Sequence, residues 1–178
     1  SDIDGDSRVI QPVKEKIILG IDPGTTIMGY GVLRVKGTKP EMIAMELSIY
    51  VNLPIIIEAA AYSRTGIKYH RKLSADELAI EAPFSQERTA MLKLGRAQGV
   101  AMAGHVRDIP ITEYAPLKIK MAITGNGQAS KEQVADMLQR MLHFPKEEMP
   151  TFMDATDGLA AAYCHFLQMG RPAIGKRI

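Results

Sequence analysis

The sequence predicts an α/β protein whose mixed sheet contains three antiparallel strands and two parallel strands, with helices on both faces. Three apolar segments joined by short turns come first, over 16–22, 29–36 and 41–50. Two further short apolar segments, 77–83 and 110–115, alternate with helical patterns. A meander of strands, followed by strands that alternate with helices, is typical of a mixed sheet covered on both faces.

The first three strands are separated by clear turn signals. Pro23 and Gly24 end the first strand, and residues 37–40 contain the glycine and proline that separate the second from the third. We expect these strands to pair as an antiparallel meander. Residues 53–75 have a weaker pattern, for which we predict one helix.

Four helical patterns follow in the second half of the chain. Residues 87–107 are amphipathic, and another helical segment starts at Pro116, a residue suited to the first helical turn. Ser130 and Gln133 have the spacing of a capping box before a run of apolar residues with helical periodicity. The last helix is predicted over about 152–169.

Length and composition favour one domain. The chain has 178 residues, of which 46% are apolar and 24% charged, enough for one well-buried core. We expect a disordered tail or expression remnant over 1–15, one domain over 16–169 and a basic tail over 170–178. Cys164 is the only cysteine, which excludes an internal disulfide framework, and it is expected in the core.

The sequence shows no apolar run near the length of about 20 residues that spans a bilayer, and no signal-peptide pattern. We therefore expect a cytoplasmic protein with no membrane contact. The net charge of +2 suggests no partner by itself. If four acids form one metal site, the remaining surface carries about +6, which suits nucleic acid.

Four carboxylates are candidates for one site. Asp22 and Glu81 each interrupt an apolar strand near its end, and they meet at one edge if the two strands are neighbours. Asp154 and Asp157 are three residues apart, so they share one helix face. Each also has a simpler explanation: a buried acid with its hydrogen bonds satisfied, or an acidic pair favoured by the helix dipole.

Taken together, the four acids predict a metal site. Carboxylates gathered in a partly buried place repel one another and take up protons unless cations are present. Mg²⁺ or Mn²⁺ fits oxygen ligands better than zinc, because no histidine or cysteine accompanies the acids at ligand spacing. Two such ions about 4 Å apart activate a water and stabilise the leaving oxygen in phosphodiester hydrolysis. His165, two turns beyond Asp157, either approaches the metals or packs as an ordinary histidine.

The order and spacing of five motifs resemble the RuvC-type Holliday junction resolvases. The motifs are GIDPG with GYGV, IEAPF, LKLGRAQGVA, EYAPLKIKMAITGNGQASKEQV and DATDGLAAA, and the resemblance covers about 16–40 and 77–168. It implies a ribonuclease H-like fold, a homodimer, two Mg²⁺ per active site with Mn²⁺ as a substitute, and paired symmetric nicks in four-way junction DNA during recombination and repair. It also implies RuvA and RuvB as partners.

The resemblance assigns roles to single residues. The family's catalytic and metal-binding acids fall on Asp22, Glu81, Asp154 and Asp157. A family aromatic that contacts bases at the opened junction falls on Phe84, where stacking is worth about 1–3 kcal/mol; a core position is the alternative.

Basic and small residues carry further expectations. Two family lysines, which contact phosphates or steady transition-state charge, fall on Lys120 and Lys131, whereas Lys118 is expected on a solvated helix face. A stripe of small residues at four-residue spacing within 87–107 suits close helix-on-sheet packing or a subunit contact; it comprises Gly95, Gly99 and Ala103.

Two segments depart from the family pattern, namely 42–75 and the loop over 85–90. The alternatives are another ribonuclease H-like nuclease, acting on RNA–DNA hybrids or similar to YqgF, and a junction-binding protein without catalysis. GIDPGTT also resembles the phosphate-binding turn of actin-class ATPases, in which Thr25 and Thr26 would hold ATP. Those ATPases need two facing domains, more than this chain supplies.

Overall fold

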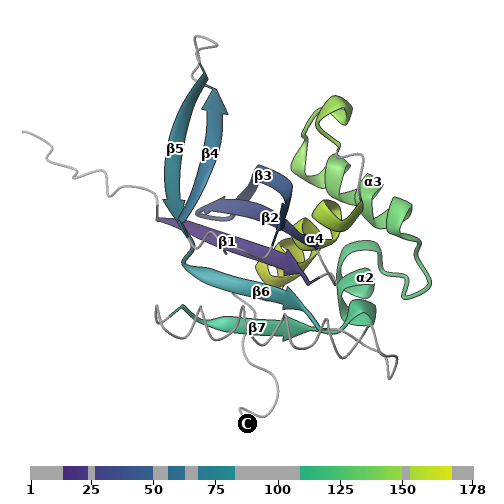
Figure 1. Cartoon of the computed structure of the whole chain (residues 1–178). Coiled ribbons are helices and arrows are strands. Elements are labelled where there is room, and N and C mark those ends of the chain that lie inside the picture. The colour runs from purple at the N-terminus through teal and green to yellow at the C-terminus, as the bar shows by residue number, and fades with distance from the viewer. Residues whose placement is uncertain are drawn as a thin grey trace, which may run out of the picture.

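The computed structural model describes residues 14–23, 27–49, 56–62, 68–82, 109–149 and 153–169. Five strands form the main sheet in the order β3-β2-β1-β6-β7, as Figure 1 shows. These strands are β1 (Glu15–Asp22), β2 (Ile27–Lys36), β3 (Lys39–Ile49), β6 (Glu77–Glu81) and β7 (Ile111–Tyr114).

The pairing of the strands confirms the predicted mixed sheet. β1, β2 and β3 form an antiparallel meander, and β6 and β7 are added in parallel beside β1. Gly29 lies opposite Asp22 across β1 and β2, while Ile80 lies opposite Ile21 across β1 and β6. The parallel register brings the carboxyl ends of β1 and β6 to the same edge of the sheet.

The helix predicted over 53–75 is wrong. The structure instead has an antiparallel pair, β4 (Ile56–Tyr62) and β5 (Lys68–Ser74), which forms a separate two-stranded sheet. β-Branched residues such as Ile56 and Ile57 lose side-chain freedom in a helix and fit a pleated strand, which favours pairing here. Figure 1 shows this pair extending away from the main sheet. The helix predicted over 87–107 lies outside the described residues.

The predicted helix starts are confirmed, and the last helix lies within one residue of its predicted ends. The helices are α2 (Pro116–Thr124), α3 (Lys131–Leu142) and α4 (Met153–Gln168), with a short 3-10 helix, η1 (Lys146–Glu148), that was not predicted. α2 starts at Pro116 and ends at Gly125, whose φ of 74° lies in the left-handed region that glycine adopts readily. The capping box of Ser130 and Gln133 is confirmed, since each side chain bonds the other residue's backbone N–H.

Buried side chains lie on both faces of the main sheet. On one face, Ile18 and Leu33 belong to a core shared with α2, α3 and α4. On the other face, Leu19 and Ile21 belong to a second buried cluster. Cys164 is fully buried in the first core, as predicted. Within the described ranges, no helix has both the length and the apolar character needed to cross a membrane.

Three glycines allow α4 to lie directly on β1 and β2. A Cβ placed on Gly20 would overlap the Gly158 carbonyl oxygen and come within 2.5 Å of the Ala162 nitrogen, and one on Gly31 would overlap Leu159. From the helix side, a Cβ on Gly158 would lie 2.7 Å from the Tyr30 Cα. This approach, backbone against backbone, sets how far the residues of α4 stand from the end of β1.

Candidate metal centre

Three carboxylates from segments far apart in the sequence meet at one edge of the sheet. Asp22 is the last residue of β1 and Glu81 the last of β6, and these parallel strands are neighbours. Asp157 lies on α4, one residue before the glycine that contacts β1 and β2. One oxygen from each of the three carboxylates lies within 4.8 Å of the others, and all three residues are half-buried.

The electrostatics of this cluster disfavour three bare charges. Burial, the largest cause, and the negative charges of Glu81 and Asp157 together raise the pKa of the Asp22 carboxyl from 3.8 to about 8. A side-chain hydrogen bond with Glu81 acts in the same direction, while Lys131 opposes the shift. At neutral pH, therefore, the metal-free cluster holds a proton that a cation would displace.

Lys131, at the start of α3, reaches the cluster from the helical side. Its Nζ donates to Asp157 Oδ2 at 2.8 Å, and the Lys131 side chain stays 59% exposed although that of Asp157 is only 14% exposed. The capping box fixes where α3 begins and so where this lysine stands. Lys131 lowers the pKa of Asp22 but does not cancel the rise that burial, Glu81 and Asp157 cause.

The other predicted site residues are placed less completely. Asp154 lies on α4 one turn before Asp157, but its side chain is not among those described. Lys120 is half-buried on α2, and within the described part of the chain its ammonium group makes no ion pair with the three carboxylates. Phe84 and the small-residue stripe within 87–107 lie outside the described residues.

His165 packs away from the three carboxylates, in a buried polar chain that no sequence motif or spacing indicates. Its Nδ1 is 2.6 Å from the Tyr114 hydroxyl, and its Nε2 is 3.5 Å from Glu77 Oε2, to which Lys16 Nζ also approaches at 3.2 Å. These groups come from β1, β6, β7 and α4. The chain ties α4 to the sheet at the end opposite Asp157.

The donor set fits a hard divalent cation. Carboxylate oxygens are the ligands that Mg²⁺ and Mn²⁺ prefer, and among the described residues no histidine or cysteine joins this cluster. Burial and the charges of Glu81 and Asp157 raise the pKa of Asp22 although Lys131 lowers it, so added positive charge would stabilise the ionised cluster. Asp22, Glu81 and Asp157 are thus the side chains that would hold such an ion.

Comparisons with known proteins identify the family of this chain. A family model described as "Crossover junction endodeoxyribonuclease RuvC" matches residues 18–165. A Bacteroides fragilis protein of that name is 70% identical over 180 residues, covering 94% of this chain and 91% of its own. A Porphyromonas gingivalis protein of the same name is 57% identical over 164 residues, covering 89% and 86%.

A solved structure shares the architecture as well. The structure titled "T. thermophilus RuvC in complex with Holliday junction substrate" superposes with a TM-score of 0.61 at 25% sequence identity, covering 84% of this chain and 92% of that one. A second, titled "Thermus thermophilus RuvC structure", also gives 0.61, at 26% identity. The predicted fold and family are both confirmed: the chain belongs to the RuvC family of crossover junction endodeoxyribonucleases.

Proposed function

We propose that this protein is a Mg²⁺-dependent DNA endonuclease that resolves four-way junctions by paired symmetric nicks during homologous recombination and DNA repair. One observation carries the proposal: Asp22, Glu81 and Asp157 meet within 4.8 Å at one edge of the sheet, in a chain that belongs to the RuvC family. The carboxylate cluster supports hydrolysis, and the family supports the choice of junction DNA.

The roles of the acids follow from their positions. Asp22, Glu81 and Asp157 hold the metals, and Asp154, one helical turn from Asp157, is the proposed fourth ligand. Two bound Mg²⁺ ions, or Mn²⁺ in their place, would supply an activated water and charge neutralisation at the leaving oxygen. Because a metal-activated water would be the nucleophile, the site needs no side-chain nucleophile.

The basic and aromatic residues are proposed to contact the DNA substrate. Lys131 and Lys120 are proposed to contact backbone phosphates on either side of the scissile bond, and Lys131 already stands 2.8 Å from Asp157. In the resting site this lysine partly neutralises the cluster, and a phosphate oxygen can take over one of its hydrogen bonds. Phe84 is proposed to stack on a base at the opened junction.

Paired symmetric nicks require two active sites, so we infer a homodimer. Light scattering on the eluted protein tests this, and a monomer that still cuts both strands would contradict it. RuvA and RuvB are proposed as branch-migration partners, and a cytoplasmic location follows, since the DNA substrate lies there in bacterial cells like those of the relatives.

The deciding experiment compares a four-way junction, a linear duplex and an RNA–DNA hybrid, each with and without Mg²⁺. We expect Mg²⁺-dependent cleavage of the junction in preference to the other two, and loss of cleavage by at least about a hundredfold in Asp22→Asn, because a metal ligand is removed. Glu147→Gln, which removes an exposed acid on η1, is the matched control. Preference for the hybrid would overturn the junction assignment, and full activity of Asp22→Asn would overturn the site.

A further inference from the structure

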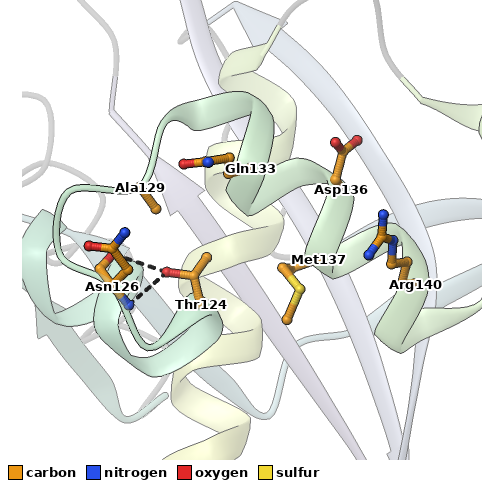
Figure 2. A pocket seen from close by; sticks show the side chains of 7 residues that line it. All are labelled: Thr124, Asn126, Ala129, Gln133, Asp136, Met137 and Arg140. Carbon is orange, nitrogen blue, oxygen red and sulfur yellow. Dashed lines mark hydrogen bonds between the residues drawn. The ribbon is translucent and has the colours of Figure 1, made fainter.

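A cleft of about 300 Å³ lies between the end of α2, the following loop and α3. It is lined by Thr124, Asn126, Ala129, Gln133, Asp136, Met137 and Arg140. Figure 2 shows these side chains around the opening, with the hydrogen bonds that join Thr124 to Asn126. Its first residue on α3, Gln133, comes two positions after Lys131, which bonds Asp157.

The hydrogen bonds already made in this cleft determine which groups remain available. Gln133 Oε1 accepts from the Ser130 backbone N–H at 2.8 Å, so the side-chain NH₂ group of Gln133 is left to donate. Asn126 Oδ1 likewise accepts from the Gln128 backbone N–H at 2.9 Å, which leaves its NH₂ group. Because a backbone N–H needs an acceptor, these contacts fix the orientation of both amides.

Arg140 adds a third donor group two turns further along α3. Its side chain is exposed, and over the described ranges its guanidinium has no ion pair or hydrogen bond. The Thr124 hydroxyl is already used by the Lys120 carbonyl and by Asn126. Available groups in the cleft are therefore mostly donors, which calls for a ligand rich in acceptor oxygens.

Asp136 is the one acid in the lining, and Figure 2 shows its carboxylate directed away from Thr124 and Asn126. The formal charges of Asp136 and Arg140 cancel, so the cleft does not repel an anion. Lys131, at the near end of α3, adds positive charge toward the metal centre.

We infer that this cleft holds a backbone phosphate of the four-way junction that the metal centre cuts. Arg, Asn and Gln side chains are usual phosphate contacts, which position DNA without reading its sequence. The inference rests on the proposed function and names a second contact for its substrate.

The α3 residues that line the cleft share one face of the helix. Gln133 and Arg140 are seven residues apart, close to two turns, so their side chains project on the same side about 10.5 Å apart along the axis. Both can therefore donate to oxygens of one ligand that lies along this face.

Two substitutions test the cleft without disturbing the fold. Arg140→Gln removes the charge of an exposed side chain. Gln133→Glu keeps the oxygen that accepts from Ser130, and so keeps the capping box, but replaces the NH₂ donor with a negative oxygen. Lys146→Gln, on η1 and outside the cleft lining, is the matched control for the lost charge.

Single-turnover cleavage of a four-way junction in Mg²⁺, measured over a range of protein and salt concentrations, gives the readout. We expect the half-saturating protein concentration to rise about three- to tenfold in Arg140→Gln, with the maximal rate unchanged and the salt slope reduced by about 1. Gln133→Glu should raise the half-saturating concentration by at least as much, because the new carboxylate repels the phosphate. Lys146→Gln should change this concentration less.

The outcomes separate this inference from the proposed function. If the unsubstituted protein cuts the junction no better than a linear duplex, the proposed function fails and the inference with it. If the junction is preferred but Arg140→Gln behaves like Lys146→Gln, the cleft inference alone is overturned. A changed base preference at an unchanged salt slope would also overturn it, since the cleft would then bind a base.

Discussion

At the scale of single residues, the chain from Tyr114 through His165 to Glu77 shows how a buried histidine is held in place. The Nδ1 atom of His165 lies 2.6 Å from the Tyr114 hydroxyl, and its Nε2 atom lies 3.5 Å from Glu77 Oε2. Burial raises the pKa of Tyr114 to about 12, so its hydroxyl keeps its proton at neutral pH. The tyrosine can therefore donate to an imidazole whose Nδ1 carries no proton.

Tyr114→Phe should destabilise the protein by about 1–3 kcal/mol, because it leaves the buried Nδ1 of His165 without a donor. Urea unfolding followed by circular dichroism measures the loss. Tyr163→Phe is the matched control: Tyr163 is also buried in the core, but in the part of the chain that the structure describes its hydroxyl has no hydrogen bond. Equal losses in the two variants would show that the bond to His165 adds nothing.

At the scale of elements, the contact of α4 with β1 and β2 decides whether the metal centre can form. Asp157 is one residue before Gly158, and Asp22 is two residues after Gly20, so the close approach of the two glycines also sets the approach of the two carboxylates. The site thus depends on positions that carry no functional group. Any side chain there would separate the ligands.

Gly20→Ala should lower the stability by at least about 1–3 kcal/mol and weaken metal binding, because its Cβ would overlap backbone atoms of α4 that cannot rotate away. Urea unfolding and a Mn²⁺ titration measure the two effects. Gly127→Ala is the control, since its Cβ would meet only side-chain atoms, of Leu117 at 2.5 Å and of Met121 at 3.5 Å, and both side chains are exposed and free to move. Unchanged metal affinity in Gly20→Ala would contradict the role given to the α4 contact.

Elements were predictable where their signals are local. α3 follows from a capping box and helical periodicity within one segment, and β1 and β2 from apolar runs around a Pro-Gly turn. Residues 53–75 were predicted wrongly because their local signals conflict. β4 and β5 pair along their whole length, with Glu58 in register with Lys72, and this backbone pairing cannot be seen within either strand alone.

At the scale of the whole molecule, the site residues were predictable from local signals, whereas their arrangement in space was not. Asp22 and Glu81 were predictable because each ends an apolar strand, and Asp157 because it belongs to a DxxD pair. Their approach to within 4.8 Å depends on strand order and on how closely α4 packs. The polar chain around His165 joins four elements and has no spacing signal in the sequence.

Because its ligands come from three distant segments, the metal centre links cation binding to the stability of the whole fold. The pKa of Asp22 is about 8 in the folded protein, against 3.8 for an ordinary aspartate. The folded chain therefore keeps a proton that the unfolded chain releases as the pH rises above about 4. The stability of the metal-free protein should fall progressively until about pH 8, and Asp22→Asn should flatten this dependence.

A divalent cation should reverse that loss. Ions that bind only the folded chain stabilise it by about 2.7 kcal/mol at a hundred times their dissociation constant, and more at pH 8 than at pH 6, where protons compete for the carboxylates. Thermal unfolding at both pH values, in EDTA, Mg²⁺, Mn²⁺ and NaCl of equal ionic strength, measures the effect. Glu147→Gln should keep the stabilisation and Asp22→Asn should lose most of it. An equal shift in NaCl would mean that screening, rather than coordination by Asp22, Glu81 and Asp157, relieves the repulsion.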